Sequence, residues 1–83
     1  MKILYFARVR QIVGIAEEDI TPPPEADNVQ ALIEWLKSRG PGYQAAFDDL
    51  RIIRAAIDQT HADIETPIAG ASEIAFFPPV TGG

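Results

Sequence analysis

The chain has 83 residues, which is enough for one domain and too few for two. A domain this small buries only about two thirds of the surface of its unfolded chain, so its core is thin and leaves little room for a deep catalytic cleft. It contains no cysteine and a single histidine, His61, which excludes disulfides, thiolate metal ligands and cysteine nucleophiles. The net charge of −5 disfavours nucleic-acid binding. No segment approaches membrane-spanning length, and no targeting segment is visible, so we expect a cytoplasmic protein.

The first third of the sequence predicts a strand, a helical turn and a second strand. Residues 2–7 are rich in β-branched and aromatic residues and do not alternate with polar ones, which predicts a central strand covered on both faces. Val9, Ile12 and Val13 have helical spacing, and Gly14 ends that turn. Residues 17–21 are charged enough to form a short edge strand.

The main helix is expected from Val29 to Arg39, after three consecutive prolines. Either Asp27 or Asn28 supplies its N-cap, and Gln30, three residues after Asp27, completes a capping-box pattern. The apolar residues follow the spacing of an amphipathic helix, and Gly40 and Pro41 stop it. The predicted core stripe consists of Val29, Leu32, Ile33 and Leu36.

The second half predicts a short helix and three strands. Residues 43–50 repeat the helical spacing over a shorter stretch, and residues 51–57 are apolar and β-branched enough for a strand. A turn is expected at residues 58–60, a weak return strand at 61–65, and the last strand at 73–77. The order indicates an α+β domain: a mixed sheet of four to five strands with one main helix packed across it. The two most apolar strands, the first and the last, form the natural parallel pair at its centre.

The last strand leads into an unusual C-terminal segment. Because side chains alternate along a strand, Phe76 belongs with Ile74 in the core, and Phe77 belongs with Glu73 on the wetter face. Two prolines then end the strand and direct the chain outward. From Pro78 to Gly83 an extended chain reaches about 20 Å, at roughly 3.3 Å per residue. Gly82 and Gly83 have no side chains, so this segment, the tail, fits a narrow channel in a partner.

A terminal Gly-Gly pair alone is also compatible with a frayed chain end. The combination of a strand, two prolines and a terminal Gly-Gly is a more specific signal of function. The ending from Phe76 to Gly83 (FFPPVTGG) closely resembles the small subunit of molybdopterin synthase, a sulfur carrier. The resemblance covers essentially the whole chain. It includes the opening from Leu4 to Arg10 and the segment from Ala55 to Asp58, where the family usually has asparagine at the position of Asp58. The segment 69–73 lacks both aspartates of the family's usual Asp-Gly-Asp-Glu turn.

This resemblance implies a ubiquitin-like β-grasp domain over residues 1–83, with an extended, flexible tail at residues 77–83. An ATP-dependent adenylyltransferase would activate the carboxylate of Gly83 through a transient AMP adduct, and a sulfur donor would convert it to a thiocarboxylate. The tail would then enter the large synthase subunit, in a heterotetramer of two small and two large subunits, and give its sulfur to cyclic pyranopterin monophosphate. No permanently bound cofactor or metal is expected, and the catalytic groups are expected on the large subunit. The partner-binding residues would be Phe77, Pro78, Pro79, Val80, Thr81 and Gly82.

Two other functions stay open at this point. The first is a sulfur carrier of the same fold that serves thiamine synthesis or tRNA thiolation. The second is a ubiquitin-like interaction module whose tail does no chemistry.

For several single residues the sequence allows either a functional or a purely structural role. His61 is expected at the surface rather than as a base or ligand, and the acidic runs at 17–19 and 48–49 are expected to be solvated. Trp35 is expected at the edge of the core. Arg8 and Arg10 either contact an acidic partner or an adenylate phosphate, or are ordinary exposed residues.

Overall fold

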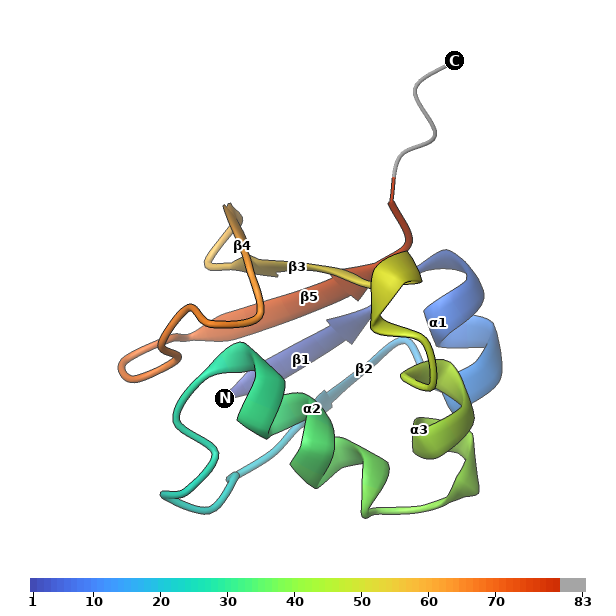
Figure 1. Ribbon diagram of the computed structural model, residues 1–83, viewed down its shortest axis with the longest axis horizontal. Coiled ribbons are helices and arrows are strands. Elements are labelled where there is room, and N and C mark those ends of the chain that lie inside the picture. Colours follow the sequence, from blue (N-terminus) through green and yellow to red (C-terminus); the bar gives the residue numbers. More distant parts are fainter. Residues whose placement is uncertain (80–83) are drawn as a thin grey trace.

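The computed structural model describes residues 1–79 as a five-stranded sheet with helices on one face (Figure 1). The sheet order is β2-β1-β5-β3-β4. The elements in chain order are β1 (Lys2–Tyr5), α1 (Ala7–Val13), β2 (Glu17–Asp19), α2 (Val29–Lys37), α3 (Pro41–Ala46), the 3-10 turn η1 (Leu50–Ile52), β3 (Arg54–Ile57), β4 (Thr60–Ala62) and β5 (Glu73–Phe77).

The centre of the sheet is the predicted parallel pair. β1 and β5 run parallel with Lys2 opposite Glu73 and Tyr5 opposite Phe76, while β2 and β3 flank them in antiparallel orientation. β2 is an edge strand, as its charge predicts. Along β1, Ile3 and Tyr5 are buried, but Leu4 is only half-buried. The expectation that both faces of β1 are covered is therefore wrong, because the helices cover one face only.

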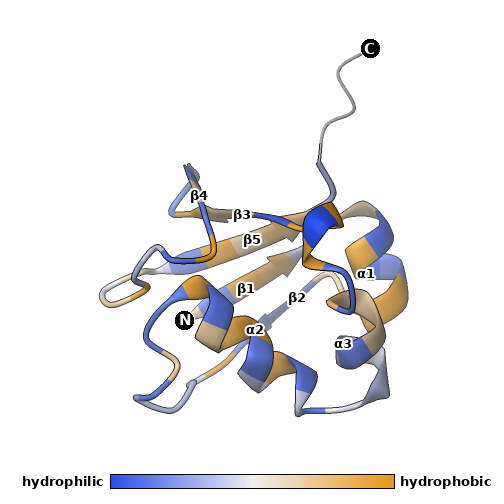
Figure 2. Cartoon of the chain, in the orientation of Figure 1, coloured by the Kyte–Doolittle hydropathy of each residue, from blue (hydrophilic) through white to orange (hydrophobic). Residues whose placement is uncertain are grey.

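Helix α2 supplies the other half of the core. Its four predicted apolar residues are fully buried against the sheet, and the hydrophobic sides of α2 and of the central strands face one another (Figure 2). Asn28 is the N-cap, since its side-chain oxygen accepts a hydrogen bond of 2.8 Å from the Ala31 amide. The predicted capping box is wrong, because the N3 position that would complete it is Ala31 and not Gln30.

Four predicted strands are shorter than expected. β1 and β2 each end two residues early, at Tyr5 and Asp19, and for β3 and β4 a side chain causes the difference. Residues 51 and 52 form part of η1 rather than of a strand because the Asp49 carboxylate accepts from the Arg51 amide and caps that turn. β4 ends at Ala62 because the next residue, Asp63, begins a turn in which its carboxylate accepts from the Glu65 amide and the Thr66 hydroxyl. The main predicted helix, α2, is accompanied by α1 and α3, which correspond to the helical turn expected at residues 9–13 and the short helix expected at 43–50. The bounds of α3 differ from that expectation, since the helix begins at Pro41 and ends at Ala46.

Asp58 organises the end of the sheet that lies opposite the tail. It forms a two-residue hairpin turn with Gln59, and both residues have positive φ, 48° and 71°. Its carboxylate also accepts hydrogen bonds from the amides of Ser72 and Glu73, at 3.0 and 2.9 Å. This one side chain thus joins the β3–β4 turn to the start of β5.

Glu18, expected to be solvated, is instead the centre of a hydrogen-bond network. Its side chain is 14% exposed, and one of its oxygens accepts from the hydroxyls of Tyr5 and Tyr43, at 2.8 and 2.7 Å. Its other oxygen lies 3.0 Å from the guanidinium of Arg39, which stacks over the rings of Trp35 and Tyr43. The network joins the edge strand β2 to β1, to α3 and to the end of α2. Trp35 packs at the edge of the core, as expected.

The network changes the acidity of Glu18. Partial burial alone would raise its pKa, but the hydrogen bonds from Tyr43, Tyr5 and Arg39, and the charge of Arg39, outweigh burial and lower the pKa below that of an ordinary glutamate. Burial, followed by the hydrogen bond to Glu18, raises the pKa of Tyr5, so the tyrosine remains a donor. A carboxyl group with a lowered folded-state pKa stabilises the fold above its unfolded-state pKa. That contribution is lost as the pH falls through the folded-state pKa.

We therefore predict that Glu18 makes folding stability depend on acid pH. In urea denaturation between pH 7 and pH 3, the wild-type chain should lose more free energy of unfolding than the Glu18→Gln variant, whose side chain does not titrate. The matched control is Glu25→Gln, which changes an exposed residue in the loop before α2. A Glu18→Gln variant with the same acid dependence as the wild type would contradict the role given to Glu18.

Candidate functional site

The end of β5 is the candidate site, because it fixes where the C-terminal segment leaves the domain. Phe76 is fully buried and packs its ring between those of Tyr5 and Phe47, with centroids 6.4 and 5.0 Å away. Phe77 points to the opposite face of the sheet and is half-buried. The alternation predicted from the sequence is therefore confirmed. The buried phenylalanine anchors the strand, and the next residue is available to solvent.

Phe77 is flanked on the open face by residues from β3 and β4. Arg54 is its partner in the β3–β5 register, and the His61 ring meets the Phe77 ring edge-on, with centroids 5.6 Å apart. His61 is exposed, as expected. Pro78 and Pro79 follow, both half-buried, and the chain turns away from the sheet there (Figure 1). The predicted site residues Val80, Thr81, Gly82 and Gly83 lie outside the described residues.

A second exposed aromatic residue stands beside this point. Phe6 follows β1 directly, its amide donates to the carbonyl of Phe76 at 3.0 Å, and its side chain is 48% exposed. The next residue, Ala7, has a positive φ of 49°, which is an unfavourable conformation for alanine and holds the chain in a sharp turn into α1. The sequence reading assigned Phe6 to a covered strand. The period-two alternation from Ile3 and Tyr5 would have indicated that it points outward.

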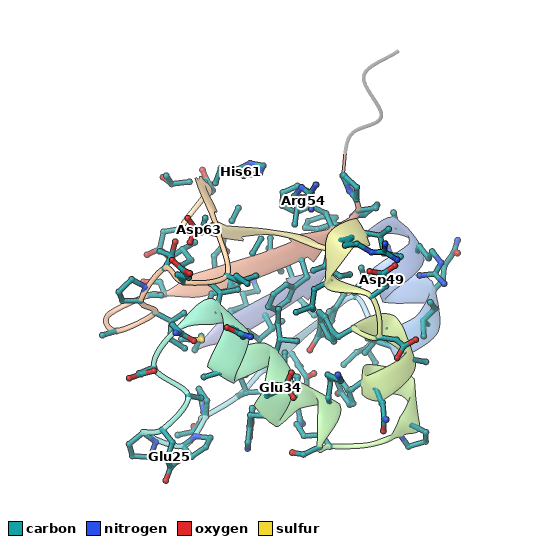
Figure 3. All side chains as sticks on the ribbon, in the orientation of Figure 1. Glu25, Glu34, Asp49, Arg54, His61 and Asp63 are labelled. Atoms are coloured by element: carbon teal, nitrogen blue, oxygen red, sulfur yellow. The ribbon has the colours of Figure 1, made fainter. Side chains whose placement is uncertain are left out.

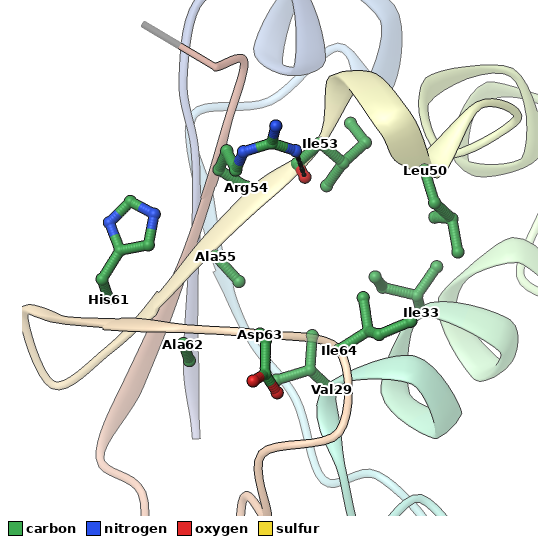
Figure 4. A pocket seen from close by; sticks show the side chains of 10 residues that line it. All are labelled: Val29, Ile33, Leu50, Ile53, Arg54, Ala55, His61, Ala62, Asp63 and Ile64. Atoms are coloured by element: carbon green, nitrogen blue, oxygen red, sulfur yellow. Dashed lines mark hydrogen bonds between the residues drawn. The ribbon is translucent and has the colours of Figure 1, made fainter.

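The described residues contain a cavity but no candidate metal site. Among residues 1–79 there is no group of three or more His, Asp or Glu side chains placed to hold a metal ion. None of its helices is long and apolar enough to cross a membrane. The most prominent cavity, of about 510 Å³, lies between α2, η1 and the β3–β4 hairpin (Figure 4). It is lined mainly by apolar side chains, and its polar residues are Arg54, His61 and Asp63. The Asp63 carboxylate already accepts hydrogen bonds from Glu65 and Thr66 in its own loop.

Comparison with known proteins identifies relatives over the full chain. The model of the ThiS family matches residues 3–83. The molybdopterin synthase sulfur carrier subunit of Escherichia coli is 34% identical over 83 residues, with 100% of this chain and 99% of the relative covered. The protein of the same name from Haemophilus influenzae is 32% identical over 83 residues with the same coverage. The human one is 31% identical over 88 residues, covering 100% of this chain and 93% of the relative.

Solved structures support the fold. SAMP1 from Haloferax volcanii superposes with a TM-score of 0.75 at 23% identity, over 100% of this chain and 98% of that one. A putative molybdopterin converting factor, subunit 1, from Pyrococcus furiosus superposes with a TM-score of 0.67 at 24% identity, with 95% of both chains covered. The expected α+β β-grasp architecture, with a five-stranded mixed sheet, is confirmed.

The opposite placement of the two phenylalanines predicts opposite effects on stability. Phe76→Ala should reduce the free energy of unfolding by about 3–5 kcal/mol, because it leaves a cavity between Tyr5 and Phe47. Phe77→Ala should reduce it by less than about 1 kcal/mol, because that ring is half-buried at the surface. Urea denaturation measures both values. If Phe76→Ala does not fold, Phe76→Leu allows the same comparison with a smaller loss of stability. Equal reductions in the free energy of unfolding at the two positions would refute the assignment.

Proposed function

We propose, since the chain belongs to the ThiS family and to its molybdopterin synthase sulfur carrier subunits, that it carries sulfur as a thiocarboxylate on Gly83. The observation that carries this proposal is the position of the tail root, by which we mean residues 77–79, where the chain leaves the sheet. Phe76 is locked in the core, and the two prolines after Phe77 direct the chain away from the sheet. A carrier needs a rigid domain that presents a terminal carboxylate away from its own surface. The anchored end of β5 supplies the rigid domain, and the two prolines set the direction in which the chain leaves it.

The chemistry proceeds in two activation steps on a partner enzyme. A carboxylate is a poor electrophile, so one oxygen of Gly83 attacks the α-phosphate of ATP on an adenylyltransferase and expels pyrophosphate. A sulfur donor at the oxidation level of hydrosulfide then attacks the acyl carbon of this mixed anhydride through its sulfur and loses its proton, and AMP leaves with the electron pair of the broken C–O bond. The resulting thiocarboxylate is more acidic than an alkyl thiol, so it is ionised and nucleophilic at neutral pH without a helper base.

Sulfur delivery takes place in the large subunit of molybdopterin synthase. The tail enters that subunit, and the thiocarboxylate sulfur forms a bond to a carbon of cyclic pyranopterin monophosphate in place of an oxygen substituent, which leaves with its electron pair. Water then cleaves the acyl–sulfur bond, so the sulfur stays on the pterin and the Gly83 carboxylate is regenerated. Two deliveries complete the dithiolene. The catalytic groups belong to the large subunit, in an assembly of two small and two large chains. We infer a cytoplasmic location, where ATP for the activation step is available.

Phe77 and Phe6 are the apolar contacts of this assembly in our proposal, because both stay accessible beside the tail root. We predict that Phe77→Ala weakens binding to the large subunit by about tenfold or more, as expected for an aromatic residue at the centre of an interface. Calorimetric titration measures the affinity. The matched control is Ile64→Ala, which removes a 40% exposed apolar side chain from the loop after β4. Equal affinities for wild type and Phe77→Ala would exclude Phe77 from the interface.

The proposal for Gly83 is tested by reconstitution with the adenylyltransferase, ATP and a sulfur source, followed by intact-mass spectrometry. The wild-type chain should gain the mass difference of one oxygen replaced by sulfur. Deleting Gly83, or adding one alanine after it, should abolish this product without unfolding the domain, since the core ends at Phe76. Gly82→Val should impair the reaction by widening the tail, whereas Ala69→Val, in an exposed loop, should not. An extended, untrimmed chain that still supports molybdopterin synthesis would overturn the proposal.

A further inference from the structure

The seven Lys and Arg residues divide into two groups by what they contact. Four of them form salt bridges with carboxylates: Lys2 with Glu17, Lys37 with Glu34, Arg39 with Glu18 and Arg51 with Asp49. Within residues 1–79 the remaining three, Arg8, Arg10 and Arg54, form no salt bridge, and all three are exposed. We call these three the tail-end arginines.

All three lie at the end of the domain from which the tail departs. Because β1 and β5 are parallel, α1, which carries Arg8 and Arg10, begins beside the point where β5 ends, and α1 packs against β5. On the other side of β5, Arg54 is the register partner of Phe77, so its side chain shares the open face with that ring (Figure 3). The fold thus brings cations from two distant parts of the sequence to both sides of the tail root.

The guanidinium of Arg54 is held in place but not neutralised. It donates to the carbonyls of Arg51 and Ile53, at 3.2 and 3.0 Å, and these neutral acceptors fix its position over η1. The nearby carboxylate of Asp49 is bound to Arg51 through two hydrogen bonds, at 3.0 and 2.9 Å, so it does not compensate Arg54. The positive charge therefore remains available to a partner.

Five of the twelve acidic residues lie away from the tail root, whereas Asp49 lies near Arg54 and is paired with Arg51. Asp19, Asp58 and Glu73 lie at the opposite end of the sheet, and Glu25 and Glu34 lie on the α2 side, far from the tail root (Figure 3). A chain with a net charge of −5 thus has its unneutralised arginines concentrated at one end. An acidic surface on a partner attracts the end with the arginines and repels the rest of the domain. Its electrostatic field therefore orients the domain while the two proteins associate.

We propose that the tail-end arginines dock on a ring of acidic side chains around the mouth of the channel that receives the tail. This rests on the proposed function, since it gives the chemistry of the partner surface for that same tail. A phosphate group attached to the end of the tail is a less suitable ligand for these arginines than an acidic protein surface. An extended tail carries its terminal carboxylate about 13 Å beyond Pro79, at roughly 3.3 Å per residue, whereas the arginines remain at its root. They therefore meet the outside of the channel and not the reacting carbon.

The test measures association with the purified large subunit of molybdopterin synthase by stopped flow, at low and high salt. The double variant Arg8→Gln/Arg10→Gln and the single variant Arg54→Gln should each slow association several-fold at low salt. The triple variant should slow it about tenfold or more, within the range of electrostatic steering. These differences should shrink once the Debye length falls to about 3 Å at 1 M salt. Dissociation rates should change less than association rates.

The matched controls separate local charge from total charge. Lys2→Gln/Lys37→Gln lowers the net charge by the same two units as Arg8→Gln/Arg10→Gln, but at sites away from the tail root. If this control slows association equally, total charge explains the effect and the proposal is overturned. It is also overturned if association is unchanged while ATP-dependent activation at saturating adenylyltransferase falls, which would indicate a phosphate contact. Failure of the wild-type chain to form a thiocarboxylate would instead contradict the function of Gly83 and leave the association result standing.

Discussion

The parallel pairing of β1 with β5 is the constraint on which the rest of the structure depends. Parallel neighbours end at the same edge of a sheet, so the exit of β1 into α1 and the exit of β5 into the tail lie together. The antiparallel β3 starts at that same edge with Arg54. One choice of strand direction thus places the exposed ring of Phe6, the half-buried ring of Phe77 and three arginines around the tail root, although they come from separate parts of the chain.

Phe76 makes this exit rigid. Its ring is enclosed by aromatic neighbours from β1 and from the segment after α3, and its carbonyl accepts from the Phe6 amide. The strand alternates with period two, so burying Phe76 requires Phe77 to face the other side. The core and the proposed binding surface are therefore coupled through adjacent residues. A register shift that improved one would destroy the other.

Local patterns in the sequence were sufficient for the features that local forces control. The apolar stripe of α2, the alternation along β5 and the charged character of β2 each follow from residues a few positions apart, and the structure confirms them. The ends of β3 and β4 were misplaced because polar side chains, those of Asp49 and Asp63, form turns that compete with the strand ladder. The capping box was misassigned because Asn28, one residue later than Asp27, reaches the helix amides.

Long-range contacts account for what the sequence could not predict. Glu18 looks like one of three solvated acids, and only the fold brings it to Tyr43, 25 residues away, and to Arg39. Arg54 likewise sits in an apolar run, where nothing in the sequence separates it from the paired Arg51. Whether an arginine is neutralised depends on its three-dimensional neighbours, so the grouping of the tail-end arginines appears only in the folded chain.

The distribution of polar groups is consistent with a protein that supplies position and a reactive end rather than catalytic side chains. Its most elaborate polar network, around Glu18, joins the edge strand to the helices and lies away from the tail root. Beside the tail root the side chains are aromatic rings and uncompensated cations, which are suited to binding another protein. A carrier that several partners must each recognise benefits from this arrangement. In the proposed function, the tail separates the proposed binding surface from the reacting carbon of Gly83. Each partner would then hold the domain by the same contacts while it performs its own chemistry on the terminal carboxylate.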